Sequence, residues 1–227
     1  MTDTPVRVLL VDDDALVRSG LSLMLGGRDD LHVVGQAGDG RAAVEAVGAG
    51  GVDVVLMDVR MPVLDGIEAT RKITGSGAAT DVLILTTYAE DELVLRALAA
   101  GAAGYIVKDS PPAEIVRAVH AVAAGDSVLS PGVTRAVVKA LGISGSGGVG
   151  DPGRRGARSR LDRLTSRERE VAVRLAQGDS NAAIAQRLYM GVPTVKAHVS
   201  SILAKTGTTN RVQAALLIHD AGLDPES

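Results

Sequence analysis

VDVVLMDVRMPVLDG, at residues 52–66, is the stretch of sequence that decides the fold. Its first six residues are almost continuously apolar, which is typical of a strand inside a parallel sheet covered on both faces. Met61-Pro62 and Asp65-Gly66 favour a turn that leads into a helix. Functional side chains gather at the carboxyl ends of the strands in such sheets, so Asp58, where the strand ends, is expected to lie in a site.

The sequence around this strand repeats one alternation. Short runs of Val, Leu and Ile predict strands, and the segments between them have helical periodicity. Five repeats of strand then helix predict an α/β domain with a doubly wound, parallel (βα)5 sheet. The strands are expected at 6–11, 32–36, 52–57, 82–86 and 104–107, and the helices at 15–25, 40–47, 65–74, 91–100 and 112–124.

A Gly-rich segment separates this region from a second one that has only helical patterns. Residues 142–160 read GISGSGGVGDPGRRGARSR, which predicts a flexible tether, preceded by a short helix at 133–141. The arginines of the tether either stay in a solvated linker or add attraction to DNA. The expected organisation is a first domain at 1–126, a linker helix and tether over 127–160, and a small all-α domain at 161–227.

Composition narrows the classes of function. The chain has no Cys, so disulfides, thiolate metal sites and a Cys nucleophile are excluded, and it has no Phe or Trp. Residues 1–153 carry 12 Lys and Arg against 20 Asp and Glu, whereas residues 154–227 carry 12 against 7. The acidic first part and basic second part favour two different partners, the second a polyanion. The sequence has no long apolar segment, which favours a cytoplasmic protein without a membrane partner.

Five polar side chains fall at successive strand ends of the first domain. Asp12 and Asp13 follow the first strand, Asp58 the third, Thr86 the fourth and Lys108 the fifth. Clustered carboxylates are compatible with a hard divalent cation, so Asp12, Asp13 and Asp58 could hold Mg2+. One carboxylate could then accept a phosphoryl group, with Lys108 and Thr86 around its oxygens. Alternatively, Asp12 and Asp13 only cap the next helix, a role that suits Asp14 better.

The motifs at these strand ends resemble those of response-regulator receiver domains, which have a flavodoxin-like fold. They are VDDD at 11–14, VLMDVRMPVLDG at 55–66, LTT at 85–87 and GYIVKD at 104–109. The resemblance implies that Asp58 is the phosphoacceptor and that Asp12 and Asp13 help to hold Mg2+. It also implies that Thr86 and Tyr105 form the switch pair and that Lys108 is the lysine of the phosphoryl site.

The second domain has the pattern of a helix-turn-helix. Thr165 and Glu168 have capping-box spacing, Ser180 can cap the following helix, and Pro193 suits the first turn of a third. LTSREREV, NAAIAQRL and TVKAHVSSILAKTG resemble the LuxR-type helix-turn-helix, with a fourth helix over 211–221. Together the two domains resemble the NarL/FixJ class of two-component response regulators. Tyr189-Met190-Gly191 departs from the usual turn residues of that family.

The LuxR resemblance implies which residues contact double-stranded DNA. Lys196, Ala197 and Ser200 are the candidates for base edges, where Lys196 could donate to guanine and Ala197 could contact a thymine methyl. The alternative for Lys196 is a solvated surface lysine, and for His198 it is packing within the domain. The candidates for phosphate or framework contacts are Thr194, His198, Lys205 and Arg211.

Together, these expectations predict that the protein is a phosphorylation-regulated transcription regulator and not an enzyme. The implied partners are DNA, a cognate sensor histidine kinase and a second copy of the chain in a phosphorylated homodimer. One rival is a phosphatase or phosphotransferase that uses an aspartyl phosphate, but such enzymes generally need a second Asp where this chain has Arg60. The other rival is a DNA-binding protein whose receiver is not switched by phosphate.

Overall fold

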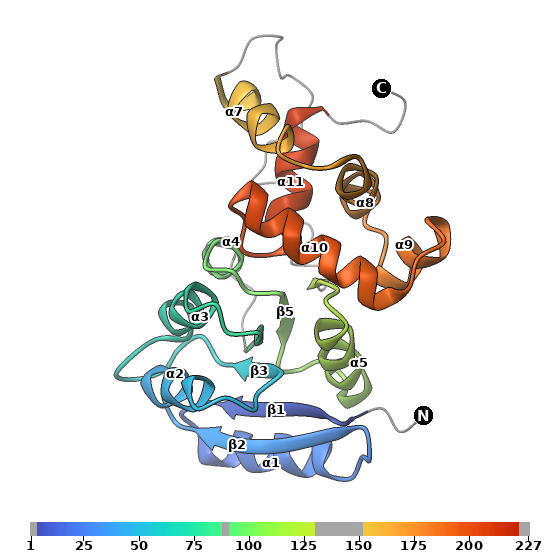
Figure 1. Cartoon of the computed structure of the whole chain (residues 1–227). Coiled ribbons are helices and arrows are strands. Elements are labelled where there is room, and N and C mark those ends of the chain that lie inside the picture. The colour runs from blue at the N-terminus through green and yellow to red at the C-terminus, as the bar shows by residue number, and fades with distance from the viewer. Residues whose placement is uncertain (1–3, 88–90, 130–151, 223–227) are drawn as a thin grey trace. The chain divides into compact units, whose positions relative to one another are not determined.

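The computed structural model describes residues 4–87, 91–129 and 152–222, which form two compact units (Figure 1). The first unit alternates strands and helices, and the described part of the second is helical. The elements of the first unit are β1 (Val6–Val11), α1 (Ala15–Gly26), β2 (Leu31–Ala37), α2 (Gly40–Gly48), β3 (Val54–Met57), α3 (Gly66–Gly75), β4 (Asp81–Thr86), α4 (Asp91–Ala99), β5 (Gly104–Val107), α5 (Pro112–Ala123) and β6 (Val128–Leu129).

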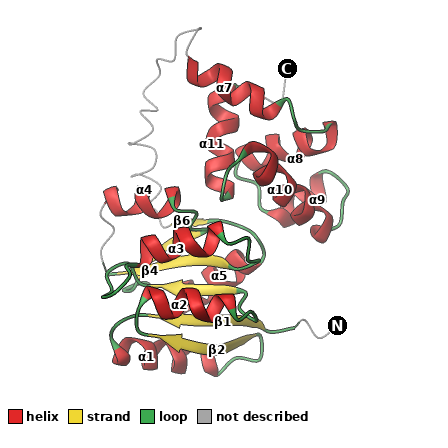
Figure 2. Cartoon of the chain, turned by 60° about the vertical axis from the view of Figure 1, so that its left-hand side comes forward, coloured by secondary structure: helices red, strands yellow, loops and turns green. Residues whose placement is uncertain are grey.

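The first unit is the predicted doubly wound sheet. All its strands are parallel and lie in the order β2-β1-β3-β4-β5-β6. The chain order reverses at β1, which pairs with β2 on one side and with β3 on the other. Figure 2 shows α2 and α3 in front of the sheet and α5 behind it. The carboxyl ends of β1 and β3 therefore border the crevice where ligands bind in open α/β sheets.

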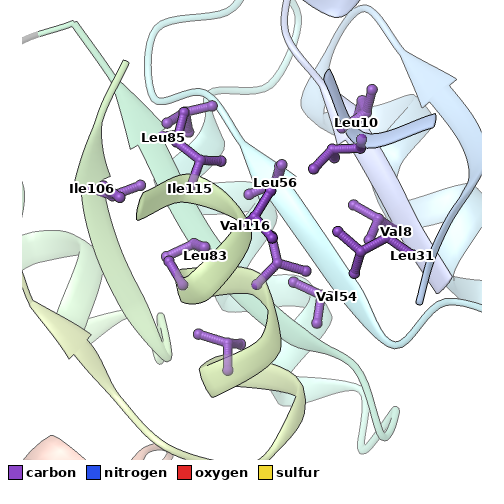
Figure 3. Packing of buried hydrophobic residues seen from close by; sticks show 14 residues of the cluster. Val8, Leu10, Leu31, Val54, Leu56, Leu83, Leu85, Ile106, Ile115 and Val116 are labelled. Atoms are coloured by element: carbon purple, nitrogen blue, oxygen red, sulfur yellow. The ribbon is translucent and has the colours of Figure 1, made fainter. Parts of the chain in front are cut away.

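The core of this unit is aliphatic, as the lack of Phe and Trp requires. Alternate side chains of the strands face one side of the sheet, where they meet the apolar sides of α1 and α5. Figure 3 shows this packing, in which Leu56 and Leu83 of the central strands lie against Ile115 and Val116 of α5. Burial of these side chains fixes the strands in register and so holds their carboxyl ends together.

The second unit has a separate aliphatic core. Val171 of α8, Ile184 of α9, Val195 of α10 and Ile218 of α11 are fully buried in it. Its helices are α7 (Pro152–Leu161), α8 (Ser166–Ala176), α9 (Asn181–Arg187), α10 (Val192–Thr206) and α11 (Arg211–Ala221). The side chains of Thr165, Ser180 and Asn210 cap α8, α9 and α11 by accepting backbone N–H bonds.

The structure differs from the sequence-based prediction in two details. The end of the predicted flexible tether forms α7, because Ala157 and Leu161 are buried and Arg158 Nε donates to the Ala221 carbonyl at 3.0 Å. The sheet also has a sixth strand, the two-residue β6, which pairs with β5 at the sheet edge. The predicted helix at 133–141 lies outside the described residues.

Candidate functional site

Three carboxylates meet at the crevice between β1 and β3. Asp12, Asp13 and Asp58 each place one oxygen within 4.8 Å of the other two, so they could share one metal ion. Asp12 and Asp58 are 2% and 7% exposed, whereas Asp13 is open to solvent. The Asp58 backbone N–H donates to the Val11 carbonyl at 2.8 Å, which ties the ends of the two strands together.

Lys108 is the cation nearest to this cluster among the described contacts. Its Nζ lies 2.6 Å from Asp12 Oδ2 and 3.1 Å from Asp58 Oδ1. Burial raises the pKa of Asp58, and the hydrogen bond from Lys108 offsets this only in part. Burial alone would lower the pKa of Lys108, but its hydrogen bonds to Asp12 and Asp58 raise it overall. The contacts with the two carboxylates therefore favour the positively charged form of Lys108 beside Asp58.

The loop that carries Asp12 is held by contacts that the sequence did not reveal. Asp14 caps α1 through its bond from Leu16 N–H at 2.8 Å, as expected. Arg18 of α1 reaches back, and its Nη1 donates to the Asp12 carbonyl at 2.6 Å. The Asp14 N–H donates to Asp12 Oδ1 at 3.0 Å. Asp12 is thus oriented by Arg18 of the helix that follows it as well as by Lys108.

Gly66 allows the loop after β3 to fold back closely against the backbone of Asp58. Its N–H donates to the Val59 carbonyl at 2.9 Å. A Cβ at this position would lie 1.8 Å from the Asp58 carbonyl oxygen, so only glycine fits without movement of the backbone. The turn signal at Asp65-Gly66 therefore has a specific meaning, because it marks a point where the backbone passes close to Asp58.

Thr86 and Tyr105 lie on the neighbouring strands β4 and β5. Thr86 is 5% exposed, and the Lys108 N–H donates to its carbonyl at 2.7 Å. The Tyr105 side chain is fully buried. The structure thus places Thr86 at the end of β4, beside the end of β5 that leads to Lys108, and it buries the side chain of Tyr105.

Helix α10 of the second unit has one open face. Thr194, Ala197 and Ser200, spaced by three residues, are exposed, whereas Val195 and Val199 are buried. This spacing puts the three exposed residues on one side of the helix. Lys196 and His198 flank that face and are half-buried.

Lys205 and Arg211 have partners inside the unit. Lys205 Nζ lies 2.7 Å from both carboxylate oxygens of Glu168, and Arg211 Nη2 donates to the Asp179 carbonyl at 2.5 Å. These contacts favour the framework role over the phosphate role for both residues.

Glu168 joins the start of α8 to the end of α10. Its carboxylate accepts from the Thr165 N–H at 2.7 Å and from Ser201 Oγ at 2.6 Å, in addition to Lys205. The capping box with Thr165 was expected from the sequence, but the contact across 33 residues to Ser201 was not. Glu168 is 4% exposed, so water competes little for these charge-assisted hydrogen bonds. They therefore fix α10 relative to α8.

The comparisons with known proteins agree with this geometry. Residues 8–120 match the response regulator receiver domain family, and residues 162–218 match the bacterial regulatory proteins of the luxR family. The transcriptional regulatory protein LnrK of Bacillus subtilis is 38% identical over 215 residues, which cover 93% of this chain and 95% of the relative. The chain belongs to the response-regulator family. It has a receiver domain and a LuxR-type DNA-binding domain.

A second relative and a solved structure are also similar to this response regulator. The DNA-binding transcriptional activator DevR/DosR of Mycobacterium tuberculosis is 41% identical, with 93% of each chain covered. The crystal structure of the response regulator ChrA from a heme-sensing two-component system is 36% identical, with a TM-score of 0.52 over 96% of this chain and 98% of that one. The matched luxR-type domain and the relatives LnrK and DevR/DosR are those of DNA-binding transcription regulators, as the sequence predicted.

The described part of the response regulator contains no helix that is both long and apolar enough to cross a membrane.

The lowered pKa of Glu168 makes the stability of the DNA-binding domain depend on pH. Hydrogen bonds from Lys205, Ser201 and the Thr165 backbone lower the pKa of Glu168 from 4.5 to about 2. A carboxyl group whose pKa is lower in the folded than in the unfolded protein stabilises the fold when the pH is above the pKa of the unfolded state. For Glu168 this contribution is lost as the pH falls from about 4.5 towards 2. We therefore expect Glu168→Gln to lower the Tm of this domain at pH 6 and to have less effect at pH 3, as measured by calorimetry.

The control is Glu170→Gln on the same helix. Glu170 pairs with Arg167 at the surface, where both side chains are more than 40% exposed, so its loss should change the Tm little at either pH. A Tm difference for Glu168→Gln that stays constant between pH 6 and pH 3 would contradict the assigned role of the ionised carboxylate.

Proposed function

We propose that this response regulator receives a phosphoryl group on Asp58 from a sensor histidine kinase and that phosphorylation controls its binding to DNA. The observation that carries this proposal is the convergence of Asp12, Asp13 and Asp58 around Lys108 at the switch point of the sheet. In the transfer, the bond from phosphorus to the donor breaks as a bond forms to an Asp58 carboxylate oxygen. No residue of this chain needs to supply or remove a proton.

The donor set suits Mg2+. Its three carboxylates are oxygen ligands, which hard divalent cations prefer, and two of them are largely buried beside a single lysine. Three carboxylates and one ammonium group leave two negative charges uncompensated, which a divalent cation would neutralise. When bound by Asp12, Asp13 and Asp58, Mg2+ would neutralise charge on the phosphoryl oxygens.

The remaining residues of the site have separate roles in this proposal. Lys108, held at 2.6 Å from Asp12, would contact a phosphoryl oxygen once Asp58 is modified. The hydroxyl of Thr86 would donate to another oxygen and so report the modification to β4. Tyr105 on the adjacent strand would repack with Thr86 and transmit the change to the surface formed by α4 and α5.

The output lies in the LuxR-type domain. Thr194, Lys196, Ala197, His198 and Ser200 of α10 are proposed to face DNA, with α10 as the recognition helix. A phosphorylated homodimer would place two copies of α10 about one helical turn apart on the duplex. The relative DevR/DosR, a DNA-binding transcriptional activator, supports this assignment of the output.

The first test measures mass and oligomeric state together. We expect the full chain with Mg2+ and acetyl phosphate to gain the mass of one phosphoryl group and to shift towards a dimer. Removal of Mg2+ with EDTA should prevent the gain, because the carboxylates then repel the incoming phosphate. Native mass spectrometry gives both quantities in one experiment.

The outcomes separate the rival functions. A mass gain without any change in assembly would exclude dimerisation as the switch. The absence of a gain from both acetyl phosphate and histidine kinases would favour a DNA-binding protein that phosphate does not switch.

A further inference from the structure

Tyr189 has a backbone conformation that is unfavourable for its residue type. Among the described residues, Val63 and Tyr189 alone combine a side chain with a positive φ, of 66° and 53°. A left-handed conformation is unfavourable for residues other than glycine, because the Cβ lies too close to the following carbonyl oxygen. Tyr189 follows the C-cap of α9, where glycine is the favoured residue, and the Met190 N–H closes the turn on the Ala185 carbonyl at 2.9 Å.

Packing does not compensate for this cost. The Tyr189 side chain is 96% exposed, whereas the side chain of Tyr105 is fully buried. The DNA-binding domain therefore gains almost nothing from the ring, and a glycine would suit the turn better. A residue that strains the fold and contacts almost nothing within it indicates a partner outside the chain.

The turn that carries Tyr189 is held in place. Arg167 Nη2 of α8 donates to the Leu188 carbonyl at 2.7 Å, one residue before Tyr189. The turn leads directly into α10, and residues 191–194 are all exposed. Figure 1 shows it as the bend between α9 and α10, at the end of the recognition helix where that helix begins.

The start of the recognition helix lies beside DNA in helix-turn-helix proteins. The N-terminal residues of the recognition helix reach the base edges, so the segment just before them lies near the sugar-phosphate backbone. Phosphate oxygens accept about half or more of all protein–DNA hydrogen bonds, and the tyrosine hydroxyl is one of the usual donors.

We propose that Tyr189 is a DNA-backbone contact whose phenol donates a hydrogen bond to a phosphate at the start of the recognition helix. The inference rests on the proposed DNA binding through α10 and adds a residue that lies outside that helix. Because the phenol is uncharged, its contact contributes affinity without releasing a counterion.

The test compares variants of the full chain on one duplex, selected from random sequences with the wild-type protein. We expect Tyr189→Phe, which removes only the hydroxyl, to weaken binding about fivefold to tenfold in fluorescence anisotropy. The dependence of affinity on salt should keep its slope. Tyr189→Gly should weaken binding at least as much, yet leave the Tm unchanged or higher, because relief of the strained φ opposes the added freedom of the unfolded chain.

Val63→Gly is the matched control. Val63 is 70% exposed with the same backbone strain, but it lies in the receiver domain. It should reproduce the effect on the Tm and leave DNA affinity unchanged.

Unchanged affinity in both Tyr189 variants would overturn the inference. Unchanged affinity with a loss of transcription in vitro would also overturn it, since the ring would then contact RNA polymerase instead. A wild-type chain that selects no duplex would overturn the proposed DNA binding itself, and the inference with it.

Discussion

Asp58→Asn is expected to abolish the gain of phosphoryl mass completely while the receiver domain stays folded. The amide has the shape of the carboxylate but is not a nucleophile, so no bond to phosphorus can form. Asp12 still holds Lys108 at 2.6 Å, which leaves the lysine with a partner. Intact-mass measurement with acetyl phosphate and Mg2+ gives the result directly.

The same variant has a second expected signature in stability. Burial raises the pKa of Asp58, so the ionised carboxylate at pH 7 is unfavourable in the folded state when Mg2+ is absent. The sign is therefore opposite to that of Glu168. Asp58→Asn should raise the Tm of the receiver domain at pH 7, and its advantage should shrink as the pH falls and Asp58 itself becomes protonated.

Asp29→Asn is the control for both measurements, because Asp29 is exposed and lies outside the carboxylate cluster. It should keep the mass gain and the Tm of the wild type. A phosphoryl gain that persists in Asp58→Asn would place the acceptor on another residue. A Tm that falls at pH 7 would mean that Lys108 stabilises the ionised Asp58 more than burial destabilises it.

Gly66→Ala is expected to destabilise the receiver domain by about 3 kcal/mol and to slow phosphorylation. The added Cβ would meet the Asp58 carbonyl oxygen at 1.8 Å and the Met57 Cγ at 3.1 Å. The first contact is to backbone, which cannot rotate away, so the loop after β3 must move and overpacking strain results. Urea unfolding measures the stability, and the rate of mass gain measures the displacement of Asp58.

Gly75→Ala provides the comparison within the same helix. A Cβ at Gly75 would meet no heavy atom within 4 Å, so alanine should be neutral or stabilise α3 by up to about 1 kcal/mol. Equal stability of the two alanine variants would show that the backbone beside Asp58 yields easily, contrary to the close approach in the structure.

Much of the receiver domain was predictable because its pattern is local. Alternating apolar runs and helical periodicity identified the five long strands, and β1 and β5 begin and end at the predicted residues. In a parallel sheet the strand ends share one edge, so this pattern also brought Asp12, Asp58 and Lys108 to one place. The structure confirms their proximity, whereas their chemical roles remain predictions.

The missing parts depend on contacts between distant residues. Arg18 beneath Asp12, and the bonds of Glu168 to Ser201 and Lys205, join separate elements and have no short-range signal. The Gly and Arg content of α7 favours a tether, but packing on α11 overrides this local preference. Lys205 has the charge of a phosphate contact, and only the structure reveals the carboxylate that it meets.

The lack of Trp has a consequence for spectroscopy. The ultraviolet emission of this protein comes from its three tyrosines, one of which, Tyr105, is fully buried, whereas Tyr189 is 96% exposed. A soluble quencher such as iodide should therefore reach Tyr189 and spare Tyr105. Among the described residues, Tyr105 is thus a shielded emitter in the receiver domain and Tyr189 an accessible emitter just before α10, so a quencher distinguishes the two.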